Sequence, residues 1–231
     1  ILSSTISGND ASEDGGGIFN TGTLTVSNST ISGNNADTRG GGIYNNGSLT
    51  LTNVTVVNND GGQGGGLYAG GVVTMGNSLL AENTGFGPDG RGEIASAGNN
   101  FVGDASELNG LGETDQAGDA MEPLDALIGA LADNGGPTLS HVAESAESPI
   151  VDGGSGTLAS NAGLDVDQRG ADRIYGDAVD IGSCERVEEE SLTVTSLQDS
   201  GAGSLRAALG SEKRARDTAI TLPRTGTTWP L

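Results

Sequence analysis

The chain has 231 residues, including 41 glycines, only 3% aromatic residues and a formal net charge of −21. This length allows one elongated domain or two small ones, and the composition is typical of a repeat protein with many tight turns. Such an acidic chain repels nucleic acid and anionic membranes, so we expect neither as a partner, whereas divalent cations remain compatible. We also expect no transmembrane segment, because no apolar run is long enough to cross a bilayer.

A repeat of about 25 residues runs through the first third of the chain. The sequence STISGN at residues 4–9 returns at 29–34, and weaker versions stand at 54–59 and 78–83. Glycine triplets and threonine-rich runs recur between these segments with the same period. A fixed period of this length indicates a solenoid, a propeller or an array.

Each repeat contains three short runs of alternating polarity that are separated by glycine and asparagine, which predicts three strands and their turns. No helical periodicity appears in residues 1–84, so we predict an all-β fold in which each repeat forms one coil of a parallel β-helix. Four apolar columns should point inward and form ladders: Ile6, Ile31, Val56 and Leu80; Ile18, Ile43 and Leu67; Leu24, Leu49 and Val73; and Ile1, Val26, Leu51 and Met75. Because Ile1 already fits a column, we expect the chain to begin in the middle of a coil.

Two further columns consist of asparagine. They comprise Asn9, Asn34, Asn59 and Asn83, and Asn28, Asn53 and Asn77. Asparagine tolerates left-handed backbone geometry, and its amide bonds to turn backbone or to the next amide in a stack. Both columns are therefore predicted to be ladders that stabilise turns.

After residue 84 the repeat fades and five short motifs follow in order. They are GNNFVGD at 98–104, DNGGPT at 133–138, SPIVDGG at 148–154, DQRG at 167–170 and DIG at 180–182. Through these motifs, residues 78–187 resemble the bacterial choice-of-anchor Q domain, although Ser-Cys-Glu follows the last motif where the family has Ala, an aromatic residue and Glu. The repeats before them resemble a right-handed β-helix of the polymorphic outer-membrane type.

This resemblance implies a large exported bacterial surface protein and no known catalytic residue. It favours three regions: truncated β-helix coils at 1–84, the choice-of-anchor-like end of the solenoid at 85–187, and a linker with the start of a second β-helix cap at 188–231. We expect an extracellular or cell-surface location, and an extracellular glycan or another surface component as partner. The oligomeric state stays open.

The last region contains two expected strands, at 192–196 and 218–223, and one short helix at 205–209. Residues 222–226 read LPRTG, which matches the sortase sorting pentapeptide. The same letters also fit a strand of a cap, and we favour this second interpretation.

Two sets of residues are candidates for ligand binding. Phe19, Tyr44 and Tyr68 form one column, each directly after an inward aliphatic residue. An exposed aromatic ladder of this kind could stack on sugar rings, although packing at a corner of the coil is the alternative. The acidic residues Asp165, Asp167, Asp172, Asp177 and Asp180 could hold calcium through hard oxygen ligands. Ion pairs to Arg169 and Arg173 are the competing explanation.

The remaining candidates for chemistry are weak. Acidic residues between the first and second strands of each coil could line a groove, but that position is also the usual solvated loop: Asp10, Glu13, Asp14, Asp37 and Asp60. His141 is the single histidine and Cys184 the single cysteine, so neither a zinc site nor an intramolecular disulfide is expected. We therefore predict a non-catalytic, adhesin-like structural segment. The alternative is a fragment of a polysaccharide lyase or glycoside hydrolase built on a β-helix, or a glycan-binding module.

Overall fold

The computed structural model describes residues 1–187, 192–193 and 220–221. The chain divides into two compact units, Ile1–Arg186 and Val187–Leu231. In the second unit, β18 (Leu192–Thr193) pairs in parallel with β19 (Ile220–Thr221). The helix expected at 205–209 and the sorting motif at 222–226 lie outside the described residues.

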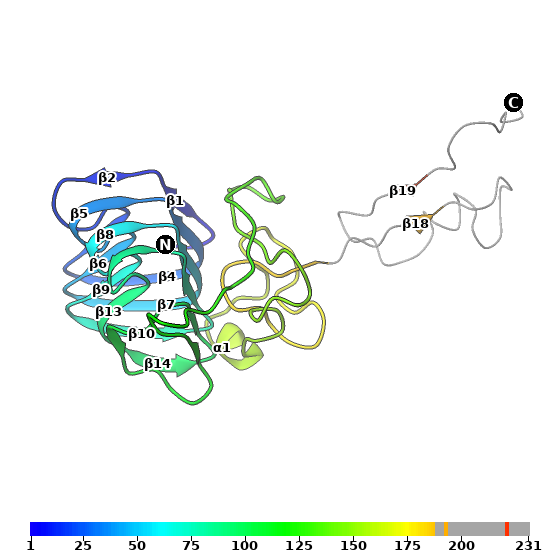
Figure 1. The fold of residues 1–231 in the computed structure, drawn as a ribbon. Helices are drawn as coiled ribbons and strands as arrows, with labels where there is room; N and C mark the ends of the chain where they lie inside the picture. Colours follow the sequence, from blue (N-terminus) through cyan, green and yellow to red (C-terminus); the bar gives the residue numbers. More distant parts are fainter. Residues whose placement is uncertain (188–191, 194–219, 222–231) are drawn as a thin grey trace, which may run out of the picture. The chain divides into compact units, whose positions relative to one another are not determined.

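The first unit is built on a parallel β-solenoid of about four turns, with about 24 residues in each turn (Figure 1). Three parallel sheets run along it. The eight-stranded sheet contains β1 (Thr5–Ser7), β4 (Thr23–Ser32), β7 (Ser48–Val57), β10 (Val72–Gly76), β11 (Leu79–Ala81), β14 (Ala95–Gly98), β15 (Phe101–Val102) and β17 (Gln116–Ala117). The four-stranded sheet contains β2 (Asp10–Ala11), β5 (Asn35–Arg39), β8 (Asp60–Gln63) and β12 (Thr84–Phe86). The five-stranded sheet contains β3 (Ile18–Asn20), β6 (Ile43–Asn45), β9 (Leu67–Ala69), β13 (Gly90–Glu93) and β16 (Leu108–Asn109).

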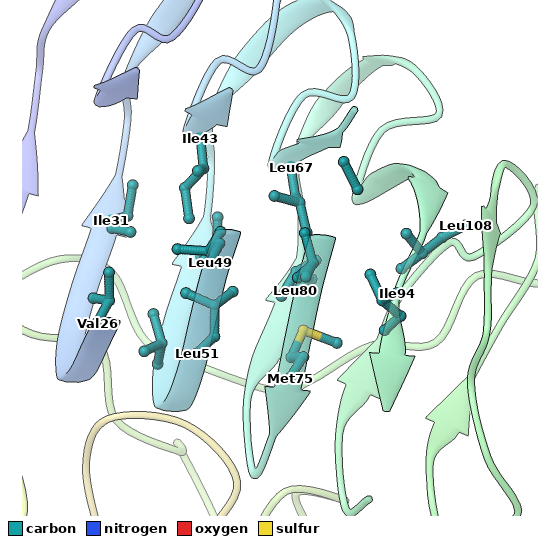
Figure 2. Packing of buried hydrophobic residues seen from close by; sticks show 14 of the residues in the cluster. Val26, Ile31, Ile43, Leu49, Leu51, Leu67, Met75, Leu80, Ile94 and Leu108 are labelled. Carbon is teal, nitrogen blue, oxygen red and sulfur yellow. The ribbon is translucent and has the colours of Figure 1, made fainter. Parts of the chain in front are cut away.

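The register of the strands confirms the predicted apolar columns. Ile31 lies between Ile6 and Val56, and Leu80 lies beside Val56. The inward residues of neighbouring coils contact each other along the axis of the solenoid and form one apolar core (Figure 2). A fully buried aliphatic side chain of this kind contributes about 1.5–3 kcal/mol relative to an exposed one. The parallel β-solenoid predicted from the repeat is therefore confirmed.

The glycine triplets follow from the close approach of neighbouring coils. The first glycine of each triplet has a positive φ: +73° at Gly15, +66° at Gly40 and +63° at Gly64. A Cβ atom on the second glycine of the middle triplet, Gly41, would lie 2.0 Å from the carbonyl oxygen of Asp60. A side chain there would push the two coils apart.

The first asparagine column forms a directed ladder of hydrogen bonds. The side-chain amide of Asn9 donates to the Oδ1 atom of Asn34 at 2.8 Å, Asn34 donates to Asn59 at 2.9 Å, and Asn59 donates to Asn83 at 2.9 Å. The backbone N–H of each of these donors bonds to the same oxygen. The predicted ladder is confirmed, and it ends on a residue that the repeat does not reveal, since Asn83 donates to the carboxylate of Asp89 at 2.9 Å.

Asp89 suits the end of this ladder because an ionised carboxylate only accepts hydrogen bonds. Its Oδ1 atom accepts from the side chain and the backbone of Asn83, and its Oδ2 atom accepts from the backbone N–H of Asp104 at 2.6 Å. Burial raises the pKa of Asp89 to about 6, although these donors act in the opposite direction.

Two members of the second asparagine column lie inside long strands, and the third lies between two strands. Asn28 and Asn53 stand in the middle of β4 and β7, with φ of 44° and 52°, and Asn77 follows β10 with φ of 50°. The positive φ bends the chain at each of these positions. Asparagine is one of the few residues that adopt this geometry at low cost.

Residues 126–185, which we call the strap, pack against the outer side of the eight-stranded sheet (Figure 1). The strap is mostly irregular and contains the short helix α1 (Gly156–Asn161), which was not predicted there. Its apolar anchor is a second core cluster, in which strap residues pack on outward side chains of the solenoid: Ala126, Ala143, Ile150 and Ile181 on Val57, Leu79, Ala81 and Phe101.

Candidate functional site

The aromatic column lies on the outer side of the five-stranded sheet. Phe19, Tyr44 and Tyr68 are direct partners in β3, β6 and β9. The ring centroids of Phe19 and Tyr44 are 4.9 Å apart and those of Tyr44 and Tyr68 are 5.5 Å apart, with interplanar angles of 18° and 12°. These distances are close to the spacing of about 4.8 Å between neighbouring strands, so the rings stack along the axis of the solenoid.

The guanidinium group of Arg39 lies over two of the three rings, those of Tyr44 and Tyr68. Its guanidinium carbon lies 4.9 Å from the ring centroid of Tyr44 and 5.2 Å from that of Tyr68. The same guanidinium donates two hydrogen bonds to the carboxylate of Asp14, at 2.9 and 2.6 Å. The hydrogen bond to Asp14 raises the pKa of Arg39 above its ordinary value. The positive charge beside the rings is therefore already balanced within the fold.

This packing limits how the column can meet a sugar. Carbohydrate stacking needs an open ring face, but the two tyrosines face neighbouring rings and Arg39. Tyr44 is only 7% exposed, whereas Phe19 is 58% exposed at the end of the stack. The structure is compatible with both interpretations of the column, packing and glycan binding. Tyr44 is packed between its neighbours, whereas Phe19 has an exposed ring on which glycan binding can be tested.

The acidic residues between the first and second strands bond mainly to adjacent coils. Asp10 accepts a hydrogen bond from Asn35 at 2.7 Å, and Asp60 accepts one from Thr84 at 2.8 Å. Asp14 pairs with Arg39 as described, while Glu13 and Asp37 are exposed. We assign no catalytic residue to this set.

The five aspartates considered for calcium are not gathered into one site. Asp167 and Asp180 are each 1% exposed, whereas Asp165, Asp172 and Asp177 lie at the surface. Within residues 1–187 and the two short strands beyond them, no group of three or more histidine, cysteine, aspartate or glutamate side chains is placed to hold a metal ion. Calcium binding stays a prediction, and it has no preformed group of ligands in this part of the chain.

Asp167 instead organises the turn in which it lies. Its carboxylate accepts hydrogen bonds from the backbone N–H groups of Arg169 at 2.8 Å, Ala171 at 3.0 Å and Glu185 at 3.0 Å. The Nε atom of Arg169 also donates to it at 3.0 Å. This is the ion pair that the sequence offered as the competing explanation.

Arg173 pairs with a different acid from those considered. Its Nη1 atom lies 2.8 Å from the carboxylate of Glu185, and both side chains are almost completely buried. Burial raises the pKa of Glu185, and the attraction of Arg173 opposes this rise. Burial also raises the pKa of Asp180, whose carboxylate accepts the backbone N–H groups of Asp152 and Arg186. Charged groups here hold the strap together.

The centre of the contact between the strap and the solenoid is Gln168, which is 1% exposed. Its side-chain oxygen accepts a hydrogen bond from the hydroxyl of Thr30 at 2.7 Å. Its side-chain nitrogen donates to the hydroxyls of Thr5 and Thr138, both at 3.0 Å, and to the carbonyl oxygen of Leu139 at 3.1 Å. One amide thus connects two coils of the solenoid with two segments of the strap.

Ser183 repeats this connection one coil further along. Its backbone N–H donates to the hydroxyl of Thr55 at 3.0 Å, and its own hydroxyl lies 3.0 Å from that of Thr30. The columns Thr5–Thr30–Thr55 and Asn28–Asn53–Asn77 therefore bind the strap from four successive coils. We call the bonds made by Gln168 and Ser183 the clasp.

The second asparagine column serves the strap more than its own turns. Asn28 donates to the carbonyl oxygen of Val166 at 2.6 Å and accepts a hydrogen bond from Arg173 at 2.6 Å. Asn77 exchanges two hydrogen bonds with the backbone of Ser155, at 2.8 and 2.9 Å. One bond within the column is present, from Asn77 to Asn53 at 3.2 Å. The predicted turn ladder is therefore a minor part of what these residues do.

His141 and Cys184 are buried parts of the same contact. The Nδ1 atom of His141 lies 2.7 Å from the carbonyl oxygen of Gly129, which can only accept, so Nδ1 carries the proton. Nε2 then accepts a hydrogen bond from the hydroxyl of Ser32 at 2.9 Å. Burial lowers the pKa of His141 and raises that of the Cys184 thiol. Both residues pack the strap on the sheet.

Comparisons with protein-family models, with curated proteins and with solved structures found no match for this chain. In the part of the chain that the structure describes, no helix is long and apolar enough to cross a membrane.

Proposed function

We propose that the chain is a non-catalytic, stalk-like or adhesin-like segment of a large exported bacterial surface protein. The observation that supports this proposal best is the strap, which bonds to side chains from four successive coils. Coils of a solenoid otherwise contact only their neighbours. A brace across several coils resists separation of the stack, which is a property useful in a load-bearing segment.

The resemblance to the choice-of-anchor Q domain belongs to this proposal, and the positions of its motifs give it a physical meaning. The DQRG motif supplies Asp167 and Gln168, which organise the turn and form the clasp. Thr138 of the DNGGPT motif accepts a hydrogen bond from Gln168, and Asp152 of the SPIVDGG motif bonds through its backbone to Asp180 of the DIG motif. Residues of four motifs thus bond to one another or to the solenoid.

The brace is tested by replacing Gln168 with alanine. This change leaves buried hydroxyl and carbonyl groups with fewer partners, so we expect a loss of about 2–4 kcal/mol in the free energy of unfolding, measured by urea denaturation and circular dichroism. Gln63→Ala is the matched control, because Gln63 accepts its hydrogen bond from Arg91, far from the strap. Equal losses in the two variants would show that the clasp does not brace the coils.

The surface location needs a separate test. Antibodies raised against this chain are expected to label intact, unpermeabilised cells of the source bacterium. Labelling that appears only after the cells are permeabilised would contradict the proposed export, whatever the stability measurements show.

Glycan binding is the second candidate function, and the exposed ring of Phe19 is the observation that favours it. Phe19→Ala should reduce retention on a panel of immobilised bacterial and host glycans. Tyr44→Ala removes a packed ring from the same column and controls for local unfolding. Retention that neither change reduces would count against binding at this column. Release of reducing sugars from any polysaccharide in the panel would favour the enzyme alternative instead.

A further inference from the structure

A second column of side chains runs beside the aromatic column. Its residues are register partners in four successive coils, and the last three stand at the ends of β5, β8 and β12: Asp14, Arg39, Gln63 and Phe86. The aromatic column itself continues past Tyr68 to Arg91 in the fourth coil. In the first three coils, only a glycine triplet and one aliphatic residue separate the two columns. We call the eight side chains of the two columns the corner strip: Asp14, Arg39, Gln63, Phe86, Phe19, Tyr44, Tyr68 and Arg91.

Contacts between the two columns hold the corner strip together. The guanidinium group of Arg91 donates a hydrogen bond to the side-chain oxygen of Gln63 and lies 4.8 Å from the ring centroid of Phe86. Arg39 connects the columns two coils earlier, through its contacts with the two tyrosine rings. Side chains that are already fixed lose little conformational freedom when a ligand binds. The corner strip is therefore a preorganised surface.

Each end of the corner strip presents an aromatic ring to solvent. Phe19 in the first coil is 58% exposed, and Phe86 in the fourth coil is 53% exposed. Three coil spacings of about 4.8 Å place these rings about 14 Å apart along the axis of the solenoid. Between them lie half-buried polar side chains, among them Arg39, which has five N–H donors and uses two of them on Asp14. The strip thus combines two stacking surfaces with hydrogen-bond donors between them.

The charges at the corner strip are paired. Asp14 lies 2.6 Å from Arg39, and Glu107 of the following coil lies 3.9 Å from Arg91. Residues 1–101 contain no other lysine or arginine, and the whole chain has a net charge of −21. An anionic polymer would therefore meet repulsion without an unpaired cation to offset it. A cationic ligand would find ring faces that the two arginines already cover. A neutral ligand meets neither obstacle.

A sugar chain fits this surface better than a protein partner. The centre of a stable protein interface is a contiguous, mostly apolar patch. In the corner strip the exposed apolar side chains are Phe19 and Phe86, and they stand at opposite ends with polar groups between them. Aromatic rings that alternate with hydrogen-bonding groups suit sugars, which have apolar ring faces and hydroxyl edges.

We propose that the corner strip binds a neutral, linear polysaccharide that lies along the axis of the solenoid. This inference rests on glycan binding, the second candidate function, and adds the charge and the length of the ligand. The rings of Phe19 and Phe86 stack on two separate sugars of one chain, and the polar groups between them bond to hydroxyl groups. A monosaccharide reaches only one of the two rings, because they lie about 14 Å apart.

The first test is affinity electrophoresis of the full chain in native gels. The gels contain mixed-linkage β-glucan or galactomannan, which are neutral, or polygalacturonate, which is acidic. Phe86→Ala removes one end ring, and the control Val72→Ala removes a similarly exposed apolar side chain from the eight-stranded sheet, outside the corner strip. Circular dichroism first shows that both variants fold. We expect a neutral polysaccharide to retard the wild type and Val72→Ala equally, and the dissociation constant of Phe86→Ala to rise roughly 2- to 10-fold.

The second test needs no variant. Oligosaccharides of increasing length, prepared from the polysaccharide that is retained, are titrated into the wild type in a calorimeter. We expect the affinity to rise with length and to level off once one oligosaccharide covers both end rings. An affinity that does not depend on length would overturn the extended ligand.

The outcomes separate this proposal from glycan binding in general. Retention by none of the polysaccharides would contradict both. Retention by polygalacturonate alone would overturn the neutral ligand and leave glycan binding in place. Binding that Phe19→Ala weakens and Phe86→Ala leaves unchanged would confine the site to the aromatic column and overturn the corner strip. Self-association that Phe86→Ala abolishes in sedimentation, without any retention, would assign the strip to a second copy of the chain.

Discussion

Asn59 gives the most direct test of how the solenoid is held together. It is 1% exposed, and its Oδ1 atom accepts hydrogen bonds from the backbone N–H of Asn34 at 3.0 Å and from the Asn34 side chain at 2.9 Å. Its amide donates to the carbonyl oxygens of Ile31 and Val57 at 3.0 Å and to the side-chain oxygen of Asn83 at 2.9 Å. Asn59→Ala removes all of these side-chain bonds. Alanine can adopt the backbone conformation of Asn59, because its φ is not positive.

The expected cost follows from which groups lose their partners. Asn59→Ala removes the Oδ1 atom to which the buried N–H of Asn34 donates, and an orphaned buried donor costs about 1–3 kcal/mol. The other lost bonds add roughly 1 kcal/mol, because the side chain of Asn34 still donates to Ile6. The total of about 3 kcal/mol corresponds to a fall of roughly 6–12 °C in the melting temperature of a domain of this size.

The matched control is Asn9→Ala at the exposed end of the same ladder. Asn9 donates to Asn34, but its side-chain Oδ1 atom accepts no hydrogen bond within the described residues, so its removal orphans no buried donor. We expect a cost below about 1 kcal/mol. Urea denaturation followed by circular dichroism measures both variants. A difference between them of less than about 1 kcal/mol would refute the ladder as a source of stability.

Three further predictions concern the ladder, the coil spacing and the metal. Because burial raises the pKa of Asp89 from 3.8 to about 6, its contribution to stability is complete below about pH 4 and is lost as the pH rises through 6, by up to about 3 kcal/mol. Urea titrations across this range should show that slope in the wild type and a weaker one in Asp89→Asn, and parallel profiles would mean that the N–H donors outweigh burial. Gly41→Ala should lower the melting temperature far more than Gly22→Ala, because a Cβ at Gly41 meets the carbonyl oxygen of Asp60 at 2.0 Å while a Cβ at Gly22 meets nothing nearer than 4.0 Å; equal shifts would contradict the close approach of the coils. A chelator tests the calcium prediction: a melting temperature that falls on chelation would support it, and an unchanged one would count against it, as the bonds of Asp167 and Asp180 within the strap favour.

The coils were predictable because their signal is local and periodic. Inward residues such as Ile31 and Val56 alternate along each strand and recur once in each coil, so sequence spacing alone places them side by side. The first asparagine column was predictable for the same reason. Its end at Asp89 was not, because Asp89 stands only six residues after Asn83, outside the period.

The strap was not predictable, because its contacts are distant in sequence and follow no period. His141 lies 109 residues from Ser32, and Gln168 lies 163 residues from Thr5. The sequence contained one indication of the strap. Threonine recurs at the outward positions 30 and 55, although a solvent-exposed strand would tolerate many residue types there. The motif residues also pointed to a shared role, but only the fold shows which partners they meet.

The strap also restricts how this part of the molecule can change in evolution. Solenoids usually gain or lose whole coils, because each coil contacts only its neighbours. Here the hydroxyl of Ser183 contacts Thr30 and Thr55, which lie in adjacent coils. A coil inserted between them would move these threonines apart by about another 4.8 Å, beyond the reach of one serine. Length can therefore vary outside the braced coils, while the number of coils under the strap is fixed by the strap itself.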